Sequence, residues 1–180
     1  MSVEEEIIKN NQEEARRSHA AAFEQINVKK YVCFKLSNRD YAIDIECVQE
    51  ITEIIYIRKV IYTPSFVLGV INLRGSIIAV VDFKQLFHIG EVDIKKKSAR
   101  LIICKYNNKS LAFVADEISK IREISALEVQ QSPPTFNEIP SKYIIGMYRT
   151  NDNNLLVLLN FGEIFSCEQI TALSAGEQAG

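Results

Sequence analysis

The chain is poor in the residues from which catalytic and cofactor sites are usually built. Its 180 residues include no tryptophan, two histidines and seven glycines. The histidines, His19 and His88, lie far apart in the sequence, so a histidine-based catalytic centre or metal site has little material. No glycine-rich phosphate loop is present, which disfavours a nucleotide site. The sequence therefore predicts a protein that is not an enzyme, with no catalytic residues, no metal site and no cofactor.

Long apolar runs and an excess of positive charge are also missing. No run approaches the roughly 20 residues that cross a bilayer, and the start, MSVEEEIIKNNQEEARR, is too acidic for a signal peptide. We expect a cytoplasmic protein without direct membrane insertion. A net charge of −2 and a pI near 5.8 argue against nucleic-acid binding, which depends on a basic surface. The basic run Lys95 to Lys97 suits a solvated loop or a patch for phosphate or lipid.

The sequence contains no closely spaced pair of cysteines. The four cysteines lie far apart, with no C-x-x-C motif and no histidine nearby to complete a zinc site. They are Cys33, Cys47, Cys104 and Cys167. We expect them to act as buried apolar side chains in a reducing compartment, because free cysteine is among the most buried residue types.

From residue 30 onwards, the chain consists of short runs of β-branched and aromatic residues. KYVCFKL and RDYAIDI, separated by Ser37-Asn38, predict a hairpin, and GVINLRG with SIIAVVDF predicts another. Residues 48–61, VQEITEIIYIRKVI, have apolar groups at both helical and strand spacings. Their many isoleucines and valines favour a strand.

The chain contains an internal duplication. Residues 100–124 align without a gap on residues 30–54, and LLVLLNFGEIF (155–165) aligns on IIAVVDFKQLF (77–87). The two alignments have different offsets, so the extra length falls in the proline-rich stretch QQSPPTFNEIP. The sequence therefore predicts a five-strand unit that occurs twice.

Each five-strand unit can protect its edges by curling into a small barrel. The predicted fold class is mainly β: two tandem five-stranded SH3-like β-barrel subdomains packed together, with short helices and an N-terminal helical extension. A groove is expected between the barrels. The expected segments are an extension (1–28), a first barrel (about 41–99, with strand exchange near 30–40 as a possibility), a second barrel (about 100–160) within a body of 29–165, and a tail (166–180).

Two local features have alternative interpretations. Residues 3–27 are predicted to form a helix with a weak apolar stripe. One interpretation is a helix that docks on the body or frays; the other is a helix that binds a partner or another copy of the chain.

In the turn Asn72-Leu73-Arg74-Gly75, the arginine presents a planar set of donors that suits a partner's carboxylate or carbonyl. The alternative is a structural arginine that pairs with a local acid such as Asp82.

In its full setting, this turn is similar to a known family. GVINLRGSIIAVVDFKQLF resembles the signature of the CheW chemotaxis coupling proteins, with NLRG between the last two strands of the first barrel. YAIDIECVQEI, TPSF, YIIGMY and LLVLLNFGEIF resemble further segments of the family. The resemblance runs from about Lys30 to Phe165, and it implies the duplicated barrel that the alignment also predicts.

The resemblance implies an adaptor that joins chemoreceptor hairpin tips to the regulatory domain of the histidine kinase CheA. Other CheW-like proteins are further possible partners, and the location would be receptor arrays beneath the inner membrane. The inter-barrel groove would take the receptor tip, and exposed apolar residues at the ends of the first barrel would meet the kinase. By resemblance, the residues tied to receptor coupling or assembly are Val48, Glu50, Asn72, Arg74 and Gly75.

Three other functions stay open at this point. An attenuating scaffold, or one for a paralogous pathway, would bind receptors without activating the kinase. A nucleic-acid-binding double barrel is a lower alternative, because small barrels often have that role. The third is an enzyme whose site is assembled from scattered residues across the groove.

Overall fold

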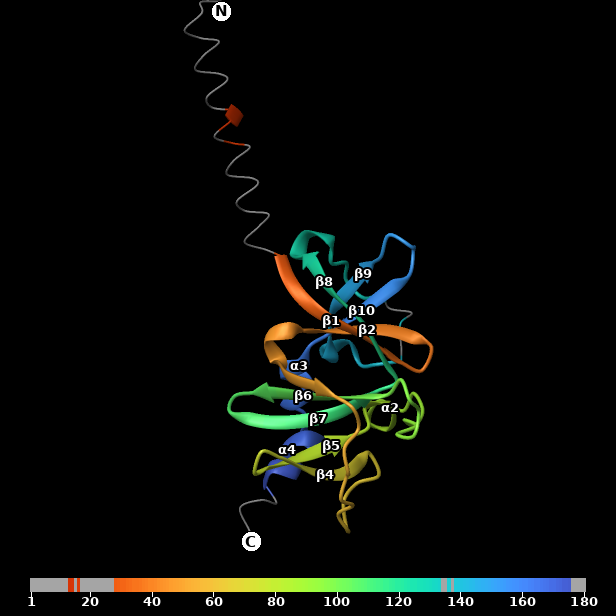
Figure 1. Cartoon of the computed structure of the whole chain (residues 1–180). Coiled ribbons are helices and arrows are strands. Elements are labelled where there is room, and N and C mark those ends of the chain that lie inside the picture. The colour runs from red at the N-terminus through yellow and green to blue at the C-terminus, as the bar shows by residue number, and fades with distance from the viewer. Residues whose placement is uncertain (1–12, 15, 17–27, 134–135, 137, 176–180) are drawn as a thin grey trace, which may run out of the picture.

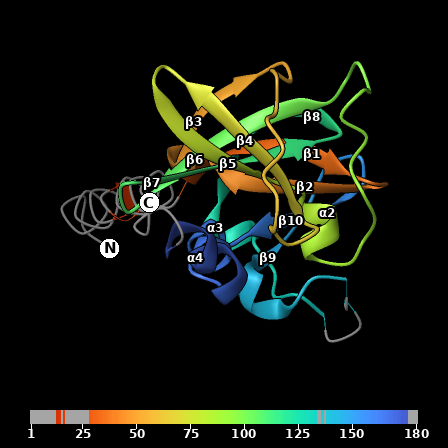
Figure 2. The same ribbon diagram turned by 90° about the horizontal axis from the view of Figure 1, so that it is seen from below.

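The computed structural model describes residues 13, 14, 16, 28–133, 136 and 138–175. Within them, ten strands form two five-stranded sheets, which lie one above the other in Figure 1. Sheet A has the order β8-β1-β2-β10-β9, and sheet B has the order β3-β6-β7-β5-β4; Figure 2 shows the strands of both sheets from below. The strands of sheet A are β1 (Val28–Leu36), β2 (Arg39–Asp44), β8 (Glu117–Ser125), β9 (Ile144–Arg149) and β10 (Leu155–Leu159). The strands of sheet B are β3 (Val48–Thr52), β4 (Val67–Leu73), β5 (Ser76–Val81), β6 (Arg100–Tyr106) and β7 (Lys109–Ala115).

Each sheet combines strands from both repeats. The β1–β2 hairpin pairs with β8 and β10 of the second repeat, and the β6–β7 hairpin pairs with β3 and β5 of the first. The sheets therefore cross the expected boundaries of 41–99 and 100–160, and the segment near 30–40, for which strand exchange was considered, pairs with strands of the second repeat. The connectors explain the exchange: η1 (Ile45–Cys47) and the single residue Asp116 carry the chain from one sheet to the other. Neither connector has the Asn-Gly type of turn that would fold the chain back into the same sheet.

Both sheets close into barrels at equivalent points, and a glycine lies at each closure. Arg58 and Val70 exchange two backbone hydrogen bonds of 2.8 and 2.9 Å, which join the chain after β3 to β4. In sheet A, Gln130 and Met147 do the same at 2.8 and 2.7 Å. A Cβ atom on Gly69 would lie 2.3 Å from the Arg58 carbonyl oxygen, and one on Gly146 would lie 2.6 Å from that of Gln130. These closures need glycine because two backbones approach closely.

The inner strands, such as β6, β7 and β10, are buried on both faces. Along β6, Ile102 and Cys104 belong to a core shared by the two sheets, whereas Leu101 and Ile103 belong to a smaller core of sheet B alone. Sheet A has a matching small core that includes Tyr31, Cys33 and Leu156. Burial on both faces accounts for the continuous apolar runs, such as LIIC, that the sequence repeats. The shared core makes the two barrels one packed body.

Short helices follow the last strand of each repeat. They are α2 (Phe83–Leu86) after β5 and α3 (Phe161–Phe165) after β10, and both begin with a side-chain cap, from Asp82 and Asn160. The remaining helical segments are η2 (Ala126–Glu128), η3 (Ser141–Tyr143) and α4 (Glu168–Ala175). The expected tail thus contains a helix, α4, and its Ile170 is buried in the shared core.

The mainly β class and the pair of five-stranded units are confirmed. The N-terminal helical extension, residues 1–28, lies outside the described residues apart from residues 13, 14, 16 and 28. In the part of the chain that the structure describes, no helix has the length and apolar character needed to span a membrane.

Candidate functional site

The NLRG segment forms a tight two-residue turn between β4 and β5. Leu73 pairs with Ser76, so Arg74 and Gly75 make up the turn, with φ angles of 51° and 90°. The Asn72 side chain holds the turn, because its Oδ1 accepts a 2.9 Å hydrogen bond from the backbone N–H of Gly75. Such turns favour Asn at the first position, since positive φ disfavours most side chains. The presence of an arginine there suggests that its side chain, and not turn stability, determines the choice.

Arg74 pairs with a residue from the opposite edge of sheet B. Its Nη2 lies 2.9 Å from Oε2 of Glu50 on β3, although β3 and β4 are the outermost strands of the sheet. Barrel closure at Arg58 and Val70 brings these edges together. The Arg74 side chain is 75% exposed and that of Glu50 is 28% exposed. Arg74 is therefore an accessible donor group whose direction is fixed by a neighbouring acid.

Asp82, the alternative partner for Arg74, is occupied elsewhere. Its Oδ1 accepts hydrogen bonds from the backbone N–H groups of Lys84 and Gln85, at 2.8 and 3.3 Å. Its Oδ2 accepts a third, of 2.9 Å, from Val92. Asp82 is fully buried and caps α2. Arg74 does pair with an acid, as the alternative interpretation expected, but that acid is Glu50 and not Asp82. An aspartate directly before a short amphipathic segment is a sequence signal for a helix cap.

Of the five predicted site residues, four lie together and one is mainly a packing residue. Glu50 contacts Arg74, while Asn72 and Gly75 shape its turn. Val48 opens β3 opposite Cys104, is half-buried and packs against the shared core. A bulge between Val48 and Glu50 breaks the regular strand register that would relate them.

Residues 53–66, here called the apolar loop, are the main feature that the sequence prediction missed. The strand predicted over 48–61 ends at Thr52, and Arg58 alone pairs with a strand further on. Three large side chains project into solvent: Tyr56 is 85% exposed, Ile61 78% and Tyr62 fully exposed. Their apolar character suggested a strand, but a gathering of exposed apolar side chains is also typical of a protein-binding surface.

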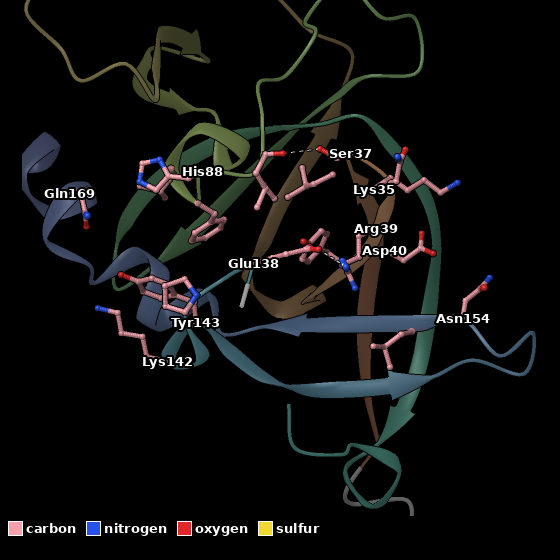
Figure 3. A pocket seen from close by; sticks show the side chains of 18 residues that line it. Lys35, Ser37, Arg39, Asp40, His88, Glu138, Lys142, Tyr143, Asn154 and Gln169 are labelled. Carbon is pink, nitrogen blue, oxygen red and sulfur yellow. Dashed lines mark hydrogen bonds and ion pairs between the residues drawn. The ribbon is translucent and has the colours of Figure 1, made fainter. Parts of the chain in front are cut away.

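A large hollow lies between the β1–β2 turn, the end of α2 and η3 (Figure 3). Its volume is about 1280 Å³. This hollow corresponds to the groove expected between the barrels. None of the five predicted site residues lines it, so the structure separates the Glu50–Arg74 surface from the hollow.

The cysteines, the histidines and the lysine run noted in the sequence lie away from the Glu50–Arg74 pair. Cys33, Cys104 and Cys167 are buried and Cys47 is half-buried, all as free thiols. Burial raises the pKa of Cys33 to about 11. His88 and the run Lys95 to Lys97 are exposed, and His19 lies outside the described residues.

Two closed five-stranded sheets around a shared core define a double-barrel β protein with an anchored surface arginine. The chain belongs to the CheW-like family, because the family model of the CheW-like domain matches residues 30–169. This membership makes it a scaffold protein of chemotaxis.

Individual relatives agree with this assignment. The chemotaxis protein CheW of Treponema pallidum is 29% identical over 146 residues, which cover 79% of this chain and 85% of that protein. CheW of Klebsiella aerogenes is 25% identical over 142 residues, with 79% and 84% covered. The crystal structure of the scaffolding protein TtCheW from Thermoanaerobacter tengcongensis matches with a TM-score of 0.70 and 30% identity, and covers 78% of this chain and 90% of that one.

Proposed function

We propose that this chain is a cytoplasmic chemotaxis adaptor that couples chemoreceptor hairpin tips to the regulatory domain of the histidine kinase CheA. The protein performs no reaction, and its function is to hold partners together in an array. The observation that carries the proposal is the Glu50–Arg74 pair. It presents an exposed guanidinium in a fixed direction, from a turn held by Asn72.

The receptor contact is assigned to the turn of residues 72–75 together with Glu50. An arginine held by a 2.9 Å ion pair loses less side-chain freedom on binding than a free one, and its remaining donors are available to a partner carbonyl or carboxylate. Arginine is also enriched among the residues that dominate binding energy at protein interfaces.

The kinase contact is assigned to the apolar loop. Tyr56, Ile61 and Tyr62 are aromatic or large apolar side chains exposed on the barrel formed by sheet B. Tyrosine anchors contribute strongly where an interface excludes water. Two separate surfaces on one rigid body allow receptor and kinase to bind at the same time.

Array assembly follows from weak contacts made repeatedly. When one contact has formed, the next takes place at a high effective concentration, so micromolar interactions are sufficient for a stable lattice. Signal transmission additionally requires different affinities for two states of the kinase or receptor, since equal affinity shifts no equilibrium.

The test is kinase activation in a reconstituted array of receptor, CheA and this chain. Arg74→Glu should weaken receptor coupling by about 1 to 3 kcal/mol, because an anchor is lost and a repulsive charge is added. Arg149→Glu is the matched control: Arg149 ends the equivalent strand β9 and donates a 3.0 Å hydrogen bond to Asn153 in the β9–β10 turn. Wild-type activation by Arg74→Glu would refute the receptor assignment.

A titration separates activation from attenuation on the same scaffold. Kinase activity is measured while wild-type protein is added to fixed receptor and CheA. An adaptor raises the activity before excess protein lowers it, whereas an attenuator lowers it from the first addition. A decrease throughout would contradict the proposed coupling function.

A further inference from the structure

Two of the free cysteines are neighbours in the fold, although they lie far apart in the sequence. Cys47 is the last residue of η1, and Cys104 lies in β6. Val48, which follows Cys47 in the chain, pairs directly with Cys104 in the antiparallel β3–β6 register. This register brings the Cα atoms of the two cysteines to about the 4.4 to 6.8 Å separation that disulfide bonds span.

The two cysteines also belong to the same core. Cys104 is fully buried in the core shared by the two sheets, and Cys47 is half-buried and packs against that core. Burial, and after it the charge of Cys47, raises the pKa of Cys104 well above its usual value. A small solute can therefore reach the Cys47 thiol, whereas the Cys104 thiol is shielded from solvent and adjacent to Cys47.

The internal duplication shows that the fold does not require cysteine at either position. In the alignment of residues 100–124 on residues 30–54, Cys47 corresponds to Glu117 and Cys104 to Phe34. Phe34 pairs with the residue after Glu117, as Cys104 pairs with the residue after Cys47. The equivalent places therefore accept a large ring and a carboxylate, so a pair of thiols is not a requirement of barrel packing.

The cysteine pair lies at the crossover between the two sheets. η1 takes the chain from β2 of sheet A to β3 of sheet B, and the orange segment of Figure 1 follows this path. β3 then carries Glu50, the ion-pair partner of Arg74. A covalent bond between Cys47 and Cys104 would fix this crossover to an inner strand of sheet B.

We propose that Cys47 and Cys104 are a redox-responsive pair that closes to an intramolecular disulfide when the protein meets hydrogen peroxide. In the first step, the Cys47 sulfur attacks the peroxide: an S–O bond forms, the O–O bond breaks, water leaves, and the thiol becomes a sulfenic acid. In the second step, the Cys104 sulfur attacks the Cys47 sulfur: the S–S bond forms and the S–O bond breaks. The departing hydroxide takes the Cys104 proton and leaves as water. In sum, two thiols and one peroxide give one disulfide and two water molecules.

The surroundings of Cys47 determine how the pair responds. Burial, followed by the charge of Asp44, raises the pKa of Cys47, so its thiolate fraction is small and oxidation is slow. The pair therefore responds to sustained and not to brief exposure. In a reducing compartment such a bridge is transient, because thiol reductants open it again. The reaction involves no contact with a receptor or a kinase, so it goes beyond the proposed function.

Peptide mapping of the full chain tests the bridge, because each of the four cysteines lies on a different tryptic peptide. The native protein is treated with hydrogen peroxide, its remaining thiols are blocked with iodoacetamide in denaturant, and it is digested without reductant. We expect residues 40–58 linked to residues 101–105, and dithiothreitol should separate them. Cys47→Ala should abolish this linked pair. Cys33→Ala is the matched control, since it removes another buried thiol, and it should leave the linked pair unchanged.

Cys104→Ala separates the two chemical steps. Without the second thiol, Cys47 should stop at the sulfenic acid, which dimedone traps, so this variant should take up several-fold more dimedone than wild type. Peroxide-treated wild type should also melt roughly 5 to 10 °C above the reduced protein, because the bridge restricts the unfolded chain. Cys104→Ala should show no such rise.

Four results would overturn the proposal. They are equal dimedone uptake by wild type and Cys104→Ala, a linked pair that forms only in urea, a Cys47–Cys47 link between two chains, and an unchanged melting temperature of the bridged protein. The third result would assign the oxidation to an encounter between copies of this chain. None of these readouts depends on receptor coupling, so this proposal and the proposed function can fail independently.

Discussion

Lys84 and Asp116 form a buried ion pair that joins the two barrels. Lys84 Nζ lies 3.1 Å from Asp116 Oδ2, and the two side chains are only 10% and 8% exposed. Lys84 is in α2, which follows sheet B, while Asp116 is the single residue between β7 and β8. Asp116 Oδ2 also accepts a 2.6 Å hydrogen bond from the backbone N–H of Ser37, in the hairpin turn of sheet A. One carboxylate therefore connects α2, the crossover and the β1–β2 turn.

Asp116→Asn should destabilise the protein strongly. The substitution leaves the Lys84 ammonium buried without a counter-charge, which typically costs about 3 to 5 kcal/mol. Urea unfolding followed by circular dichroism measures the change in free energy. Lys84→Met leaves the Asp116 carboxylate without its counter-charge, but this carboxylate still accepts the hydrogen bond from Ser37, so we expect a smaller loss than for Asp116→Asn. Equal stability of wild type and Asp116→Asn would show that the pair does not join the barrels.

Phe83→Ala should create a cavity in the shared core. The Phe83 ring is fully buried and stacks on Phe113, with centroids 4.3 Å apart and planes 15° apart. We expect a loss of about 3 to 5 kcal/mol in the free energy of unfolding. An unchanged melting temperature would contradict this burial. Tyr62→Ala is the control, because this fully exposed ring contributes little to the folded state.

Gly146→Ala tests the barrel closure without a change in backbone preference, since Gly146 has no positive φ angle. A Cβ atom there would lie 2.4 Å from Cγ1 of Val129 and 2.6 Å from the Gln130 carbonyl oxygen. The clash should separate β9 from the chain after β8 and cost about 1 to 3 kcal/mol. Hydrogen exchange of the Met147 and Gln130 amides should accelerate at the same time. Ile145→Ala, at an exposed neighbour, should alter neither quantity appreciably.

The sequence predicted the elements and the repeat better than the connections between them. Alternating and continuous apolar runs identify strands, and two similar runs identify a duplication, but neither pattern says which strand is the neighbour of which. The β1–β2 and β6–β7 hairpins are similar in sequence, so either could complete either sheet. The choice depends on two short connectors, residues 45–47 and residue 116.

The local part of the candidate site could be predicted from the sequence, whereas its contacts between distant segments could not. Arg74 and its turn were found from a local motif, whereas its ion-pair partner depends on barrel closure between Arg58 and Val70, far apart in the sequence. The apolar loop was read as a strand because isoleucine, valine and tyrosine have the same pattern in a core strand and on a binding surface. The solvent exposure of Tyr56, Ile61 and Tyr62 in the structure distinguishes a binding surface from a core strand.

The cysteines should differ in reactivity according to burial. Burial raises the pKa of Cys33 to about 11 and that of Cys104 well above its usual value, so their reactive thiolate fractions at pH 8 are small. Cys47 is half-buried, and its pKa is raised, first of all by burial. In thiol labelling of the native protein, Cys33 and Cys104 should react only after unfolding, and Cys47 should react before them. Rapid labelling of Cys104 in the native state would contradict the described core.

Arg74→Ala should separate partner binding from stability. The Arg74–Glu50 pair is largely exposed on the arginine side, and exposed ion pairs contribute about 0 to 1 kcal/mol to folding. In urea unfolding, the variant should therefore keep the wild-type free energy of unfolding to within about 0.5 kcal/mol, while a pull-down with a receptor tip fragment loses signal. Glu50→Gln keeps the shape of the partner and removes its charge, so Arg74 loses its fixed direction but not its donors. We expect an intermediate loss of receptor binding for Glu50→Gln. A fall in stability that parallels the fall in binding would mean that the pair acts through the fold and not as an anchor.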